Sequence, residues 1–414
     1  MKSGIFLLTI GTVAIGTDLF VIAGILPYIA ESFGVTVQTV GYLVTVFAII
    51  YALFGPILAI KTTHWHKPKL LIMSLGIFII GEVLSAFAIN FYMLIVARVI
   101  SAFGASLFTP VAFALAVTLV PEEKKGKGLA LVSGGLILSM AIAVPIGTWI
   151  SFLFGWRVTY LFVAAMGIIT DVGLVLTFKV RFRNKAQRGI QQQKINVKDN
   201  EIIKENNNFP LVIQRSSSLF RPSFVVAVSA YAFWGIAIFT IFPFISLILT
   251  GSLHVQPVDV GYVLALIGTG SFIGVMLGGH ATDRWGHMKT AEISISVATI
   301  ALIISYLFLS KSSLFFLLSY FMFSLAIQGF MPSQLRRVVY IASKNSHQIA
   351  LSINNSFLYI GIALGAVVGG SLIHYFSLSV LPLASGFSVI IALGLSLFSM
   401  KLEGRGQSIS YEIS

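Results

Sequence analysis

Residues 5–30 read IFLLTIGTVAIGTDLFVIAGILPYIA, and Asp18 is the only charged side chain in this run. As a helix the run would be about 39 Å long at ~1.5 Å per residue, which exceeds the ~30 Å hydrocarbon core of a bilayer. The run is too long for a secretion signal and contains an acid near its middle. We therefore expect it to remain in the protein as a first membrane-spanning helix.

Similar apolar stretches follow along the rest of the chain. The sequence is 57% hydrophobic and 10% charged with a mean hydropathy of +0.96, so a soluble core could not hide its apolar surface. Membrane strands would need alternating polar and apolar residues, which these stretches lack. The sequence predicts an all-α membrane protein with twelve transmembrane helices. We place these helices at about 5–30, 40–60, 70–89, 92–120, 128–153, 158–179, 222–249, 258–280, 290–310, 313–340, 347–374 and 380–400.

The basic residues are distributed unevenly between the two sides of this arrangement. Apart from Arg98, Arg157 and Lys311, the 27 Lys and Arg residues lie at the termini, in alternate gaps or at the helix ends beside those gaps. Basic residues accumulate on the cytoplasmic side, so we expect both termini in the cytoplasm and a multi-pass protein of the inner (plasma) membrane. The net charge of +13 is spread over loops, which indicates contact with membrane lipid and excludes a nucleic-acid patch.

One long hydrophilic segment divides the chain. Residues 180–221 carry nine Lys and Arg against three Asp and Glu, and this composition is typical of a cytoplasmic linker. We expect a six-helix bundle over 1–179, a second over 222–402, and a cytoplasmic tail over 403–414.

The two bundles repeat short patterns at similar spacing. Ile25-Leu26-Pro27 corresponds to Ile241-Phe242-Pro243, 216 residues later, and Val40-Gly41-Tyr42 corresponds to Val260-Gly261-Tyr262, 220 residues later. Internal repeats of this kind are typical of secondary transporters, whose binding sites lie near the bilayer midplane between the repeats. The fold we expect is two pseudo-symmetric six-helix bundles.

Four acidic or basic side chains lie well inside the predicted helices, away from their ends: Asp18, Glu82, Arg98 and Asp171. A charge near the bilayer centre costs about 2.5–3.5 kcal/mol on insertion scales, so it usually has a function or a partner. Asp18 and Arg98 lie at similar depths and could interact if their helices adjoin. An acid that gains and loses a proton in this way would couple transport to the proton gradient, with Glu82 and Asp171 as possible secondary acids. The alternative is a static structural ion pair.

Motifs of enzymes and metal sites are missing from the sequence. His64 and His66 flank Trp65, but two ligands without a third make a poor metal site. No nucleophile elbow, phosphate-binding loop or paired-carboxylate pattern is present. We expect neither an enzyme, nor a metal site, nor a cofactor.

Residues 278–289 read GGHATDRWGHMK and resemble the short loop signature of the major facilitator superfamily. The resemblance assigns Gly278, Asp283, Arg284 and Gly286 to a gating loop between two helices. There Asp283 would accept hydrogen bonds from a helix N-terminus and Arg284 would pair locally. The equivalent loop in the first half has Lys61 and Thr62 where Asp and Arg are expected.

Other motifs are similar to the twelve-helix drug:proton antiporter branch of that superfamily. Residues 98–104, 143–147 and 155–157 resemble its motifs in the fourth, fifth and sixth helices. The opening GTDLFVIAGILP at 16–27 is similar to arabinose, chloramphenicol and purine efflux permeases, which carry an acid at the position of Asp18. In that branch the Arg corresponding to Arg98 is implicated in proton handling.

The same resemblance implies a central cavity lined by the first, fourth, seventh and tenth helices. Aromatic and Met side chains would form adaptable walls for flat or amphipathic molecules, although plain helix packing is the alternative for each of them. Asn354 of the eleventh helix would add a hydrogen-bonding amide. The side chains expected to face the cavity are Asp18, Phe20, Phe103, Phe108, Tyr231, Trp234, Phe239, Met322, Phe323 and Gln328.

These features favour a secondary active transporter that exports small organic molecules, such as drugs or metabolites, in exchange for protons. A proton symporter or uniporter that imports solutes of the sugar or nucleoside type is the second hypothesis. A membrane receptor or scaffold without transport is the third, but it gives no reason for the intramembrane acid and Arg. The expected partners are a small molecule, protons and lipid, with no nucleic acid, and we expect a monomer.

Overall fold

The computed structural model describes residues 2–62, 65–119, 125–192, 221–342 and 347–412. Within these ranges twelve helices are long and apolar enough to cross a membrane, and each overlaps one of the predicted helices. The all-α membrane fold is therefore confirmed. The twelve spans are 4–33, 37–58, 67–86, 91–116, 131–154, 156–178, 222–252, 257–285, 287–308, 313–341, 349–375 and 378–402.

The first half contains six spans, of which the fifth is interrupted. A π-helical turn, η2, separates α5 from α6, where Pro145 lies in the first turn and cannot donate a backbone hydrogen bond. The elements are α1 (Lys2–Phe33), α2 (Val37–Lys61), α3 (Lys67–Ala86), α4 (Phe91–Thr118), α5 (Lys125–Leu138), η2 (Ser139–Ala143), α6 (Val144–Phe154) and α7 (Trp156–Gln192).

The second half also contains six spans, and its first span is interrupted at Pro243. The helix α9 there gives way to a 3-10 turn, a short helix and a π-helical turn. The elements are α9 (Pro222–Ile241), η4 (Phe242–Phe244), α10 (Ile245–Leu247), η5 (Ile248–Ser252), η6 (Pro257–Asp259), α11 (Val260–Trp285), α12 (His287–Phe308), α13 (Ser313–Ile341), α14 (His347–Tyr375), η8 (Leu378–Val380) and α15 (Leu381–Glu412).

The predicted linker and tail begin as continuations of helices. Residues 180–192 extend α7 beyond its membrane span, and residues 403–412 extend α15. The remainder of the predicted linker, 193–220, lies outside the described residues.

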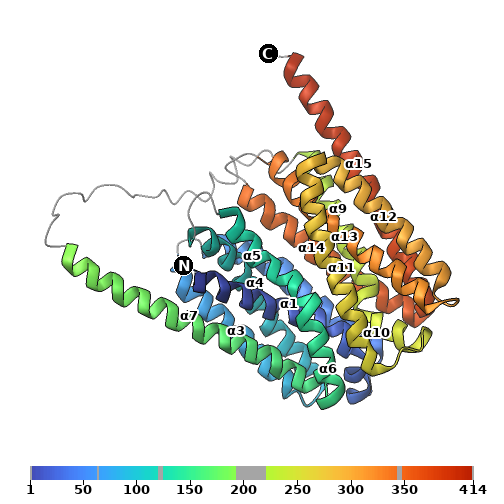
Figure 1. Cartoon of the computed structure of the whole chain (residues 1–414), viewed down its shortest axis with the longest axis horizontal. Coiled ribbons are helices and arrows are strands. Elements are labelled where there is room, and N and C mark those ends of the chain that lie inside the picture. The colour runs from blue at the N-terminus through green and yellow to red at the C-terminus, as the bar shows by residue number, and fades with distance from the viewer. Residues whose placement is uncertain (1, 63–64, 120–124, 193–220, 343–346, 413–414) are drawn as a thin grey trace.

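The helices of each half pack mainly on one another. In the first half α3 packs on α4 and α7, and in the second α12 packs on α13 and α15. The two halves meet where α2 packs along α14, where α11 packs on η2 and α6, and where α1 packs on η4 and α10. Figure 1 shows that α1 begins and α15 ends on one side of the molecule, whereas α6 and α10 lie on the opposite side. We call these the terminal side and the far side.

Hydrogen bonds and ring contacts join the halves on the far side and in the middle. The indole nitrogen of Trp149 donates to the carbonyl of Val258 at 3.2 Å on the far side. Nearer the middle, the rings of Tyr51 and Tyr359 stack with their centroids 3.7 Å apart. Such directional contacts must break if the halves rock against each other.

Candidate functional site

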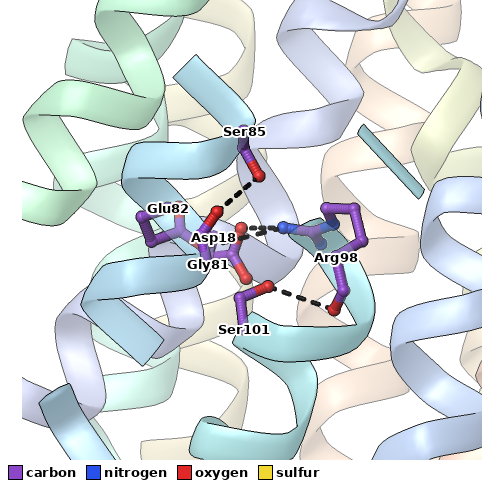
Figure 2. Close-up of polar contacts among 6 residues, drawn as sticks. All are labelled: Asp18, Gly81, Glu82, Ser85, Arg98 and Ser101. Carbon is purple, nitrogen blue, oxygen red and sulfur yellow. Dashed lines mark hydrogen bonds and ion pairs between the residues drawn. The ribbon is translucent and has the colours of Figure 1, made fainter. Parts of the chain in front are cut away.

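Three ionisable side chains from three helices converge inside the first half. Asp18 lies on α1, Glu82 on α3 and Arg98 on α4, and their exposed fractions are 1%, 0% and 0%. Arg98 Nη1 donates a hydrogen bond to Asp18 Oδ1 and lies 4.0 Å from Glu82 Oε1 (Figure 2). The predicted approach of Asp18 to Arg98 is thus present, with Glu82 beside it.

Close packing of α3 on α4 brings Glu82 to this position. A Cβ atom on Gly81 would lie 2.7 Å from Ser101 Cα, and one on Gly104 would lie 2.7 Å from the Ser74 carbonyl oxygen. Small residues allow helix backbones to approach closely within a membrane. The side chain of Asn90 begins α4 by accepting a hydrogen bond from the Met93 amide at 2.8 Å.

Aromatic rings enclose the cluster on two further sides. The guanidinium carbon of Arg98 lies 4.7 Å from the ring centroid of Phe47 on α2 and 6.0 Å from that of Tyr160 on α7. Both distances are in the range of cation–π attraction, which is stronger away from water. The cluster is therefore separated from solvent in this state.

Several buried polar atoms of the cluster make no hydrogen bond within the described chain. They are Asp18 Oδ2, both carboxyl oxygens of Glu82, and Nε and Nη2 of Arg98. Leaving such atoms without partners costs about 1–3 kcal/mol each, and more for charged groups. The cluster thus has unused capacity to bind a proton or to change its pairing.

The fourth predicted acid, Asp171, lies apart from this cluster. It is on α7, eleven residues beyond Tyr160, which corresponds to about 16 Å along a helix. Its Oδ1 atom is enclosed without a hydrogen-bond partner, and no ion pair of the described residues includes it. The structure does not bring Asp171 together with Asp18 and Arg98.

Some of the predicted cavity residues meet across the two halves. The ring of Phe20 lies 6.0 Å from Phe239 and 5.7 Å from Phe242, which is in the second half and had no predicted role. Within the second half Tyr231 stacks on Trp234 at 4.9 Å, and the Trp234 indole donates to the Ile327 carbonyl at 2.6 Å. These aromatic side chains, which apart from Phe242 were expected to line a cavity, pack against one another in this state.

The remaining predicted cavity residues have different surroundings. Phe103 packs edge-on against Phe54 and Phe323 packs against Tyr320, while Phe108 and Gln328 are buried. Met322, by contrast, is 44% exposed on the helix face that also exposes Phe315 and Leu318. We therefore leave Met322 out of the site proposed below.

Asn354 takes part in a polar contact that links three helices of the second half. Gln334 Nε2 on α13 donates to Asn354 Oδ1 on α14 at 3.0 Å and to the Ala227 carbonyl on α9 at 2.9 Å. Sequence reasoning gave Gln334 no role in the site. Its amide within a predicted membrane helix was the available signal.

The gating-loop residues lie at the turn between α11 and α12. Gly286 has φ +83°, a conformation that a side chain would strain, and it separates the two helices. Asp283 Oδ1 accepts a hydrogen bond at 2.9 Å from Arg336 Nη1, which also bonds the Thr282 carbonyl at 3.1 Å. The partner of Asp283 is therefore a side chain of α13, whereas the motif led us to expect a helix N-terminus.

Twelve membrane helices in two halves, with charged side chains enclosed among them, define a polytopic membrane transport protein. The model of the Major Facilitator Superfamily matches residues 8–244 and 224–410. The chain therefore belongs to this superfamily of membrane transporters, and it is not an enzyme.

Relatives of similar length match along nearly the whole chain. The transporter YbcL of Bacillus subtilis is 27% identical over 394 residues, which cover 95% of this chain and 94% of YbcL. The inner membrane transport protein YdhP of Escherichia coli K12 is 28% identical over 88% of this chain and 87% of its own. A chloramphenicol resistance protein of Streptomyces lividans is 26% identical over 95% of each chain.

Solved structures share the fold at low identity. A bacterial homologue of the human lysosomal transporter Spinster, in an inward-facing and occupied conformation, superposes with a TM-score of 0.73 at 17% identity over 96% of each chain. A D-xylose–proton symporter superposes with a TM-score of 0.76 at 14% identity over 97% of each chain. The protein is therefore a multi-pass membrane transporter, as expected.

Proposed function

We propose that this transporter exports small organic molecules in exchange for protons. The two bundles, 1–179 and 222–402, would alternate access to a central site while the segment 180–221 joins them, with both termini in the cytoplasm. The observation that carries the proposal is the buried ion pair between Asp18 and Arg98. Burying two charges costs free energy of desolvation, and a static scaffold has no need for such a pair.

The pair supplies the elementary step of proton coupling. While Arg98 contacts Asp18, the carboxylate is the favoured form of the acid. When the contact opens within an apolar environment, Asp18 takes up a proton, because an isolated buried carboxylate is costly. Both side chains are enclosed in this state, so proton exchange requires a change of conformation. Each proton that moves inward supplies about 2.3 kcal/mol per 100 mV of membrane potential.

The position of Asp18 on α1 connects this step to the cargo. Phe20, two residues further along, contacts Phe239 and Phe242 of the second half. A change at Asp18 therefore acts on a helix that also touches the opposite half. Aromatic side chains at this level are suited to flat or amphipathic cargo.

Export is favoured over import by the combination of sequence and relatives. The acid at position 18 belongs to a motif shared with efflux permeases, and a chloramphenicol resistance protein is among the relatives. The fold of a D-xylose–proton symporter keeps proton-coupled import as the second candidate. The direction of proton movement separates them, because antiport and symport move protons in opposite senses when substrate is added.

The proposal is tested by transport assays in inverted membrane vesicles from cells that express the protein. Chloramphenicol is the first probe, and a panel of antibiotics, purines and sugars follows. We expect an imposed proton gradient to drive accumulation of a probe, and Asp18→Asn to abolish accumulation while probe binding persists. Asp259→Asn, which changes an exposed acid of η6, is the matched control. Uphill accumulation by Asp18→Asn equal to the wild type, or no proton-linked movement of any probe, would overturn the proposal.

A further inference from the structure

The buried cluster of the first half holds one acid more than its cation can neutralise. Asp18 and Glu82 are both enclosed, and Arg98 is the one basic side chain that pairs with either of them in the described chain. If both acids were ionised, the cluster would carry a net charge of −1 in an apolar interior. Buried groups avoid such an uncompensated charge by binding a proton.

The groups around the cluster offer no second positive charge. The helices α2 and α7 contribute the rings of Phe47 and Tyr160. On α3 and α4 the hydroxyls of Ser85 and Ser101 donate to backbone carbonyls of their own helices (Figure 2). No further cation faces the two acids among the described residues, so a proton is the remaining means of neutralising the extra charge.

The geometry distinguishes between the two acids. Asp18 accepts a hydrogen bond from Arg98 Nη1, whereas Glu82 lies 4.0 Å from the same atom and neither of its oxygens makes a hydrogen bond within the described chain. The directly bonded acid is the better place for the negative charge. Glu82 is therefore the acid that remains neutral in this state.

The packing of the fold does not itself require a carboxyl group at position 82. At the 220-residue spacing of the repeat, Glu82 corresponds to Leu302 on α12, which is also buried. At the 216-residue spacing, Asp18 corresponds to the buried Trp234. The second half fills both positions with apolar side chains, so the two acids are a feature of the first half alone.

We propose that Glu82 binds the exchangeable proton in this state and that Asp18 and Glu82 alternate as partners of Arg98. When Arg98 turns to Glu82, the O–H bond of Glu82 breaks and its proton leaves to water. Asp18 then takes a proton from water, so the cluster again has one ion pair, one neutral acid and no net charge. This inference rests on the proposed proton-coupled function and places one proton on the pair of acids.

Infrared spectroscopy of the protein in lipid tests where the proton lies. A protonated carboxyl group has a carbonyl stretch that a carboxylate lacks. Asp171 also has an enclosed carboxyl oxygen, so the variants are compared in an Asp171→Asn background. In that background we expect one such buried band, its loss in Glu82→Gln, and a shift of its frequency in Glu82→Asp but not in Asp18→Glu. The exposed acid Glu292, changed to Gln, is the matched control and should leave the band unchanged. A band that persists in Glu82→Gln, or that shifts only in Asp18→Glu, would overturn the inference.

Transport in inverted vesicles tests the role of that proton. In Glu82→Gln the pair of Asp18 and Arg98 is neutral without a proton, so we expect probe accumulation to fall to the level seen without a gradient. Retained probe binding shows that this variant is folded, and Glu82→Asp should restore accumulation. If Glu82→Gln accumulates probe like the wild type while Asp18→Asn does not, the inference fails and the proposed function stands. If both variants accumulate probe, the proposed function fails as well.

Discussion

The two acids beside Arg98 should substitute for each other in stabilising the fold, so their removal should be strongly non-additive. In Asp18→Asn, Glu82 begins 4.0 Å from Arg98 Nη1 and needs only a small side-chain movement to replace the lost partner. We expect this variant to lose about 1 kcal/mol of the free energy of unfolding, in the range of a single net hydrogen bond. Glu82→Gln keeps the bonded pair and should lose about the same or less.

The double variant, Asp18→Asn with Glu82→Gln, leaves Arg98 without an acidic partner. A guanidinium cannot lose its proton, so its buried charge stays uncompensated. Breaking a buried ion pair from one side costs about 3–5 kcal/mol. The double variant should therefore lose about 3–5 kcal/mol, at least 1 kcal/mol more than the two single losses combined. Adding Arg98→Met to the double variant removes the stranded charge and should recover most of this loss.

Unfolding of the purified protein in mixed micelles, followed by tryptophan fluorescence, gives these free energies for the wild type and each variant. If the free energy of unfolding lost by the double variant equals the sum of the losses in the two single variants to within about 0.5 kcal/mol, Asp18 and Glu82 act independently. That result, or failure of Arg98→Met to stabilise the double variant, would refute the account of one cation shared by two acids.

Three further predictions concern the surroundings of the site. Gly81→Ala should separate α3 from α4 and lower both thermal stability and probe transport. Gly76→Ala on the same helix, with no atom within 4 Å of the added Cβ, should lower neither, because Ala favours the helix over Gly and has room there. Trp149→Phe removes the hydrogen bond to Val258 and should favour separation of the far side, measured as spin-label distances between cysteines introduced into a chain that has none. Asp283→Ala breaks an exposed ion pair and should change the free energy of unfolding by less than about 1 kcal/mol in the same micelle assay.

The membrane helices were predictable because each requires only a long apolar run. The interruptions of the fifth and seventh spans were not predicted, although Pro145 and Pro243 are visible in the sequence. A proline marks a possible break, but whether the chain responds with a π-turn or a 3-10 turn depends on the neighbouring helices.

Part of the site, the approach of Asp18 to Arg98, could be predicted from the depth of each residue along its helix. Depth along a helix follows from residue number, so the shared level of Asp18 and Arg98 could be estimated before the structure. Which helices adjoin, and which faces they present, depends on packing that no single helix encodes. For this reason Glu82 was only a secondary candidate, although α3 places it beside Arg98.

Contacts between helices were also missed at the loop between α11 and α12 and among the predicted cavity residues. The motif located the turn around Gly286 but not the partner of Asp283, because Arg336 comes from a helix more than fifty residues away in sequence. Met322 lies on a helix expected to line the cavity, yet the rotation of that helix turns it to an exposed face.

The placement of Asp18 and Phe20 on one turn of α1 has a consequence for inhibition. Two residues in a helix point about 200° around the axis from each other, so one faces the charged cluster and the other faces the opposite half. A small molecule wedged beside Phe20 would hold α1 still without touching either acid. Such a compound would block proton exchange and cargo movement together, and we expect resistance to it to arise in Phe239 or Phe242 of the other half.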